Sequence, residues 1–126
     1  GGILIIDYGY IDKIMKNTLQ AISKHKYVDV LGSYRNSDIT YNLSFNLISQ
    51  MIKKLGSFSH SITTQKKFLT HLGILKRAEI LSKNLPFSKK AEIYFRVKRL
   101  IDDGQMGNLF KVMFVTNTKK KFKLGF

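Results

Sequence analysis

The sequence predicts an α/β fold, and three of its features indicate this class together. An apolar, largely β-branched run at residues 2–6 is typical of a strand buried on both faces of a parallel sheet. Apolar residues at helical spacing fill the middle of the chain. A second strand-like run, rich in β-branched and aromatic residues, covers 108–116. The order strand, loop, helix, strand, helices, strand fits the end of an α/β domain.

The first predicted strand ends in a polar turn at Asp7-Tyr8-Gly9. Residues 10–42 are polar, with Asn, Asp, Ser and Gly scattered through them, and they predict mostly loop with one short helix near 18–23. A connection of this length in a compact domain is usually functional or disordered.

A helix is predicted over residues 45–55, because apolar residues recur on one face at Leu47, Ile48, Met51, Ile52 and Leu55. Ser44 suits the N-cap position, and Gly56 suits the position just after the helix. Residues 57–62 alternate polar and apolar, which predicts a half-buried strand.

Further helices are predicted in the second half of the chain. Thr64 can cap a helix that Gly73 interrupts, and a second helix stops before Pro86. Ser88 begins the next helix, and residues 102–105 form a turn before the last strand. On that strand, Lys111 is expected to face outward. Phe110 and Met113 of the strand, and Phe68 of the helix after Thr64, are expected in the core.

The length of 126 residues predicts one domain at residues 1–118, followed by a basic tail at 119–126. The chain has no cysteine, which excludes disulfides and thiolate metal sites. The longest apolar run, at residues 3–6, is far shorter than a membrane span, and no secretory signal is visible. Because the first residue is Gly1 rather than Met, the chain could begin inside a larger reading frame, after processing or at a cloning boundary, and we favour the first of these.

The net charge of +14 raises the possibility of a nucleic-acid partner. Lysine outnumbers arginine 18 to 4 among the 22 basic residues, and this bias is typical of AT-rich coding. The lysines are also spread along the chain, which argues against a nucleic-acid site. The lysine run at 119–121 with Lys123 is interpreted as a solvated tail.

Six sequence blocks occur in a fixed order and spacing: Gly1-Gly2 through Asp7-Tyr8-Gly9; Thr18-Leu19-Gln20-Ala21 with His25 and Asp29-Val30-Leu31; Asp38-Ile39-Thr40; Thr64-Gln65 with Phe68-Leu69, Leu72-Gly73-Ile74 and Arg77-Ala78; Met106 through Val112; and Gly125-Phe126. In this order they resemble the MidA-like methyltransferase family, from the first residue nearly to the last. The chain departs from the family at Leu43-Ser44-Phe45, where Val-Asp-Phe is usual, and at Arg35-Asn36, which replaces Pro-Gly. Its lysines also replace a proline-rich tail.

The resemblance implies a class I, Rossmann-like methyltransferase sheet. This chain would supply the C-terminal part of that sheet, with strands five, six and seven, the last of them antiparallel, and their covering helices. It implies S-adenosylmethionine as cofactor and a protein arginine as methyl acceptor, with a respiratory complex I subunit as substrate. The family's glycine-rich cofactor turn lies upstream, so no cofactor-binding residue is expected in this chain. The implied partners are the upstream half and the protein substrate, in a bacterial cytoplasm or a mitochondrial matrix.

The carboxyl end of the first strand is the expected site, because ligands of open α/β sheets bind there. Asp7 is the candidate catalytic residue, since its carboxylate could pair with a guanidinium or accept a proton. Tyr8 and Gly9 are the adjoining candidates for substrate binding. Equally, Asp7 could cap a turn in which Gly9 takes a positive φ.

The long loop contributes the other candidate substrate-binding residues, which are Thr18, Gln20, His25, Asp38 and Thr40. These side chains could instead order the loop through local hydrogen bonds, and His25 could pair with Asp29. No metal site is expected, since His60 and His71 have no carboxylate at ligand spacing.

Three functions remain open from the sequence. The chain could be part of an arginine methyltransferase that is active only with its upstream half, an inactive remnant of a split gene, or a basic module that binds RNA or acidic surfaces. On its own the chain is expected to be poorly soluble, because its first strand would expose a flat apolar edge.

Overall fold

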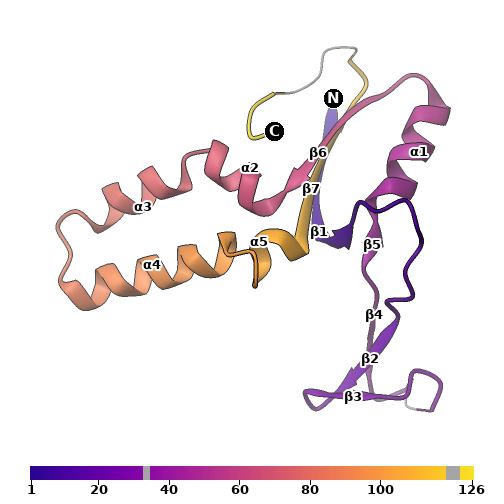
Figure 1. The fold of residues 1–126 in the computed structure, drawn as a ribbon, viewed down its shortest axis with the longest axis horizontal. Coiled ribbons are helices and arrows are strands. Elements are labelled where there is room, and N and C mark those ends of the chain that lie inside the picture. The colour runs from indigo at the N-terminus through magenta and orange to yellow at the C-terminus, as the bar shows by residue number, and fades with distance from the viewer. Residues whose placement is uncertain (33–34, 119–122) are drawn as a thin grey trace.

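The computed structural model describes residues 1–32, 35–118 and 123–126. Figure 1 shows a main sheet with a helix on one side of it, a long helical arm, and a small second sheet that projects from one end. Within the described residues, no helix is long and apolar enough to cross a membrane. The mixed α/β class predicted from the sequence is confirmed.

The main sheet contains β1 (Gly2–Tyr10), β5 (Leu43–Ser44), β6 (Ser59–Thr64) and β7 (Phe110–Thr116), in the order β5-β1-β7-β6. The last strand, β7, runs antiparallel to both of its neighbours. This arrangement agrees with the predicted terminal strands of a class I methyltransferase sheet, with the last one antiparallel. The strands β1 and β7, from the two ends of the chain, therefore lie side by side at the centre of the main sheet (Figure 1).

The outer edge of β1 lacks a strand partner over residues 2–8 in the described part of the chain. The short strand β5 pairs in parallel with β1 only at Gly9 and Tyr10. Three apolar side chains of β1 are also open to solvent, since Ile3, Leu4 and Ile6 are 64%, 48% and 48% exposed, whereas Ile5 packs against the core. The prediction that this run is buried on both faces is therefore not met within the chain itself.

The predicted turn at Asp7-Tyr8-Gly9 is wrong, because these residues continue β1. Asp7 and Tyr8 pair with Lys111 and Phe110 of β7, and Gly9 pairs with Leu43 of β5. The polar residues made this segment resemble a turn, but partners distant in sequence keep the backbone extended.

The predicted loop at residues 10–42 contains a second sheet. Its strands are β2 (Gln20–Ser23), β3 (Lys26–Val28) and β4 (Asp38–Thr40), all antiparallel in the order β3-β2-β4. The expected short helix near 18–23 is therefore wrong, because this segment is the central strand of that sheet. Figure 1 shows the small sheet projecting away from the main sheet.

Helix α1 (Phe45–Leu55) has the predicted bounds and caps. The Ser44 hydroxyl accepts a hydrogen bond from the Leu47 N–H at 3.4 Å, and Gly56 ends the helix with a φ of 70°. The helix packs Phe45 and Ile52 against Met113 of β7, and these three side chains form the buried core cluster. Ile5, Leu43, Ile48, Ile62 and Val115 surround it.

The helical arm consists of α2 (Gln65–His71), α3 (Ile74–Ser82) and α4 (Phe87–Ile101), and α5 (Met106–Leu109) leads into β7. The predicted cap is confirmed, since the Thr64 hydroxyl accepts from the Lys67 N–H, and Gly73 separates two helices at a φ of 81°. The predicted bounds shift slightly, because β6 covers 59–64, α4 begins at Phe87 and β7 begins at Phe110.

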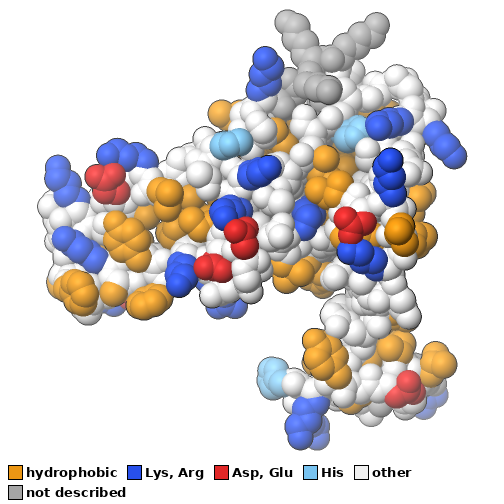
Figure 2. All heavy atoms as spheres, in the orientation of Figure 1, with side chains coloured by type: hydrophobic (Ala, Val, Ile, Leu, Met, Phe, Trp, Pro, Cys, Tyr) orange, Lys and Arg blue, Asp and Glu red, His pale blue; other side chains and the backbone are white. Residues whose placement is uncertain are grey.

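The end of the chain returns to the helical arm. The Phe126 ring meets the Phe68 ring edge-on at a centroid distance of 5.3 Å, and Gly125 lies against the same ring. The lysine run at 119–121 lies outside the described residues. Figure 2 shows basic side chains spread over the visible face, and apolar ones gathered on the arm.

The open edge of β1 leads to a prediction about solubility. Replacing Ile6 by lysine should raise the soluble, monomeric fraction of the isolated chain, because a charged edge strand resists pairing with another copy. The fraction is measured by size-exclusion chromatography after expression. The matched control is Ile80→Lys, which adds the same charge at a 64% exposed site on α3. An equal gain from the control would show that the edge is not the cause.

Candidate functional site

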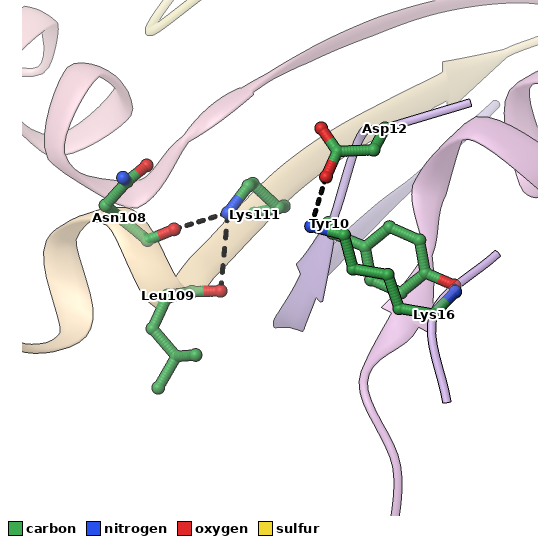
Figure 3. A network of polar contacts seen from close by, with 6 residues as sticks. All are labelled: Tyr10, Asp12, Lys16, Asn108, Leu109 and Lys111. Atoms are coloured by element: carbon green, nitrogen blue, oxygen red, sulfur yellow. Dashed lines mark hydrogen bonds and ion pairs between the residues drawn. The ribbon is translucent and has the colours of Figure 1, made fainter. Parts of the chain in front are cut away.

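The candidate site lies at the carboxyl end of β1, where the chain leaves the main sheet. Tyr10, the last residue of the strand, is only 9% exposed. Its hydroxyl accepts a hydrogen bond from the backbone N–H of Lys16 at 3.1 Å, which folds the following loop back onto the ring. The Lys16 ammonium pairs with the Asp12 carboxylate and lies 5.4 Å from the centre of the Tyr10 ring. Figure 3 shows the Lys16 side chain crossing this ring toward Asp12.

Beside this group lies Lys111, which is buried rather than facing outward as predicted. Its ammonium donates to the backbone carbonyl of Asn108 and, at 3.5 Å, to that of Leu109 (Figure 3). Burial holds the pKa of Lys111 below its usual 10.5, while the Asp12 carboxylate opposes this shift and the Lys16 ammonium adds to it. The outward prediction failed because the α5 backbone, through the Asn108 and Leu109 carbonyls, and the charged loop with Asp12 and Lys16 lie beside this side chain.

The depressed pKa of Lys111 predicts a pH-dependent contribution to stability. At low pH both states hold the proton, so the cost of burying the ammonium is fully present. Between the lowered pKa and 10.5, the unfolded chain keeps a proton that the folded chain has lost. The free energy of unfolding should therefore rise with pH across this window.

Denaturant unfolding of wild type and Lys111→Met, repeated from about pH 7 to 10.5, tests this prediction. The free energy of unfolding of wild type, minus that of the variant, should increase as the pH increases. Lys98→Met, which removes an exposed lysine from α4, is the control for the loss of a surface ammonium. A wild-type-minus-variant difference that stays flat with pH would contradict the assigned role of burial.

A pocket of about 430 Å³ opens next to the Tyr10 group. It lies between the loop that follows β1 and the start of α1, and most of its walls are apolar. Its lining residues are Tyr10, Met15, Lys16, Asn17, Thr18, Leu19, Tyr41, Asn42, Leu43, Ser44, Leu47 and Ile48. The Thr18 hydroxyl accepts a hydrogen bond from the Asn42 N–H at 3.0 Å, and this bond joins the two segments that line the pocket.

The structure places the predicted residues Asp7, Tyr8 and Gly9 on the last part of β1. The Asp7 carboxylate accepts a hydrogen bond from the Tyr8 N–H at 2.8 Å, and its backbone pairs with Lys111. The Tyr8 ring meets Phe110 edge-on at 5.6 Å. Gly9 does not have a positive φ. Its missing side chain lets β5 approach β1 closely, since a Cβ there would lie 2.3 Å from the Leu43 carbonyl oxygen.

Of the candidates from the predicted loop, only Thr18 lines the pocket. Gln20 and Thr40 face each other across β2 and β4, and Asp38 pairs with Ile22. His25 lies in the turn between β2 and β3 with a φ of 62°. The Asp29 carboxylate accepts a hydrogen bond from the Gly32 N–H at 2.6 Å, so it is engaged locally. Gln20, His25, Asp38 and Thr40 therefore belong to the small sheet.

Sequence reasoning missed Tyr10, Asp12, Lys16 and Asn42. The spacing of Asp12 and Lys16, four residues apart, is a signal that could have identified the ion pair. Tyr10 could have been found by extending the first strand, but Asn42 depends on the hydrogen bond that folds Thr18 against it.

These residues do not form a complete site for an adenosyl cofactor. Asp7 and Asp12, the carboxylates nearest the end of β1, are engaged by the Tyr8 N–H and by Lys16. The loop that follows β1 contains no glycine-rich turn. Among the described residues, no group of three or more histidine, aspartate and glutamate side chains could hold a metal ion.

Comparison with known proteins identifies similar chains. The model of a family described as putative S-adenosyl-L-methionine-dependent methyltransferases matches residues 1–63. The chain is 29% identical over 124 residues to the mitochondrial protein arginine methyltransferase NDUFAF7 of Danio rerio. The matched region covers 95% of this chain and 28% of that protein. It is also 29% identical over 112 residues to NDUFAF7 of Xenopus tropicalis, over 88% of this chain and 26% of that protein.

Two solved structures share the fold, and both are COG1565 superfamily proteins from Burkholderia thailandensis. One has a TM-score of 0.78 at 24% identity, over 99% of this chain and 35% of its own. The other, bound to S-adenosyl-homocysteine, has a TM-score of 0.75 at 24% identity, over 97% of this chain and 33% of its own. The chain thus spans about a quarter to a third of the length of the proteins it matches.

Proposed function

We infer the function of this chain from its family, because it belongs to the putative S-adenosyl-L-methionine-dependent methyltransferases, whose model matches half of it. We propose that it forms the C-terminal part of such an enzyme and is inactive without the preceding part. The preceding part would supply the cofactor turn and the remaining strands of the sheet.

The open edge of β1 is the observation that carries this proposal. Residues 2–8 pair with β7 on one side, and their other side has no partner in the described chain. The exposed apolar side chains Ile3, Leu4 and Ile6 lie along the same strand. A preceding parallel strand and its helices would pair with this edge and cover these side chains. The vertebrate methyltransferase relatives have more than two thirds of their length outside the matched segment.

We further propose a protein arginine as the methyl acceptor. The names of the vertebrate relatives support this acceptor and a mitochondrial location. The family resemblance is the basis for proposing a role in complex I assembly. The pocket beside Tyr10 opens at the carboxyl end of β1, where ligands of α/β sheets bind, and would form the substrate side of the cleft. A bacterial member would carry out the same reaction in the cytoplasm.

Calorimetric titration of S-adenosylmethionine tests whether the chain completes a methyltransferase. The chain alone should give no binding heat. A chimera in which this chain replaces the matching segment of the Danio rerio relative should bind the cofactor. The same chimera with Ile6→Lys should bind more weakly, because the charge would be buried where the two parts meet.

The intact relative is the positive control, and circular dichroism establishes that each chimera is folded. Cofactor binding by the chain alone would contradict the proposed position of the cofactor site. A folded chimera that does not bind the cofactor would favour the alternative proposal, an inactive remnant of a methyltransferase gene. RNA binding that weakens steeply with salt would instead support the basic binding module.

A further inference from the structure

We propose that the Tyr10 ring and the Asp12 carboxylate form a subsite for a cationic side chain of a protein substrate, and that Lys16 occupies this subsite as an internal substitute. The inference rests on the proposed function only in taking the ligand to be a substrate side chain. Its geometry comes entirely from residues of this chain.

The position of Lys16 shows what the subsite binds. Its ammonium lies 5.4 Å from the centre of the Tyr10 ring and forms an ion pair with Asp12 (Figure 3). A ring face and a carboxylate that converge on one point recognise a cation, because both present negative charge there. A guanidinium would satisfy the same two groups, since it stacks on aromatic rings and pairs with carboxylates in a planar geometry.

The Lys16 side chain can leave this position at little cost. The side chains of Lys16 and Asp12 are 51% and 58% exposed, and ion pairs between exposed groups contribute little to stability. The orientation of the Tyr10 ring depends instead on the backbone of Lys16, whose N–H donates to the Tyr10 hydroxyl at 3.1 Å. When the ammonium moves away, this hydrogen bond can remain, and the ring face stays in place for another cation.

The adjoining pocket gives an incoming side chain a path to the subsite. Tyr10 and Lys16 both line the 430 Å³ pocket, so the pocket adjoins the subsite, and the Asp12 carboxylate lies beyond its lining. Tyr41 and Leu47 give the pocket apolar surface suited to the methylene groups of a long side chain. The nearby ammonium of Lys111 does not fill the subsite, because it donates to the carbonyls of Asn108 and Leu109.

Titration of the 126-residue chain carrying Ile6→Lys, the substitution expected to keep it soluble and monomeric, with N-acetyl-arginine amide tests the proposal without cofactor or methyl transfer. Binding is followed by NMR through the backbone amides of Tyr10 and Asn42. Lys16→Ala should bind the probe about two- to fivefold more tightly than the same chain with Lys16, since it removes a weakly held internal competitor. Lys13→Ala is the matched control, because it removes the same charge from the same loop without touching the ring. Asp12→Asn, added to Lys16→Ala, should reverse the gain.

N-acetyl-citrulline amide, which has the shape of the arginine probe without its charge, should not bind. Equal affinities for Lys16→Ala and Lys13→Ala would overturn the proposal, because general charge would then explain the result. Binding of the citrulline probe as tightly as the arginine probe would also overturn it. Arginine binding by the chain together with no cofactor binding by the chimera would uphold the subsite and reject the methyltransferase. The reverse pattern would uphold the methyltransferase and reject the subsite.

Discussion

Replacing Phe45 by alanine should lower the free energy of unfolding by about 3–5 kcal/mol, the usual cost of deleting a buried aromatic side chain. Phe45 is completely buried and contacts Ile52 and Met113, so it joins α1 to the main sheet. Urea denaturation followed by circular dichroism measures the loss. A chain of this size has a total stability of only about 5–15 kcal/mol, so the variant should be largely unfolded at mild denaturant concentrations.

Phe87→Ala is the matched control, since the same side chain is 86% exposed at the start of α4. Its free energy of unfolding should stay within about 0.5 kcal/mol of wild type. A comparable loss for the two variants would mean that Phe45 does not hold α1 to the sheet. An unchanged stability for Phe45→Ala would contradict the core assignment altogether.

Replacing Gly9 by alanine should cost about 3 kcal/mol, at the upper end for an overpacked site. The new Cβ would lie 2.3 Å from the Leu43 carbonyl oxygen and 2.9 Å from the Phe45 ring. Because the nearest atom belongs to the backbone, β5 must move away from β1, and the pocket wall formed by Leu43 and Ser44 moves with it.

Hydrogen exchange adds a local measurement to the denaturation curve for Gly9→Ala. Amides at the junction of β1 and β5 should lose protection more than those paired between β6 and β7. Gly1→Ala is the control, because a Cβ at Gly1 meets nothing within 4 Å. Native protection at the β1–β5 junction in Gly9→Ala would show that the strands do not approach as closely as described.

Helix α1 could be predicted from the sequence because its determinants are local. Ser44 lies three residues before the amide that it caps, and Gly56 is free to adopt the left-handed conformation that ends the helix. The same reasoning identified Thr64 and Gly73 as the boundaries of the helical arm. These signals act over a few residues, so no knowledge of the tertiary structure is needed.

The last residues of β1 and the pairing of β2 with β4 could not be predicted in this way, because the partners are distant in the sequence. Asp7 and Tyr8 are extended because β7 pairs with them, and β7 lies about a hundred residues later in the chain. Gln20–Ser23 could read as a short helix, but β4 pairs with it as a strand. Tertiary pairing thus overrides weak local preference in both places.

The sequence prediction and the structure place candidate residues at the same end of β1, but they select different side chains. The sequence pointed to the carboxyl end of the first strand, and the pocket opens there. Asp7 was chosen for its carboxylate, yet the groups that converge on a cation are Tyr10 and Asp12, just beyond the expected end of that strand. Because the predicted strand ended before Asp7, Tyr10 and Asp12 fell in the predicted loop rather than at the end of the strand.

The pairing of β1 with β7 has a consequence for the order of events during synthesis. The first residues of this chain leave the ribosome well before Phe110–Thr116, the strand that pairs with them. Until then β1 must remain unpaired or associate with an earlier strand of a longer protein. Pairing between distant segments slows folding and prolongs exposure of apolar surface. A preceding part, folded first, would act as a template that holds β1 until its last partner emerges.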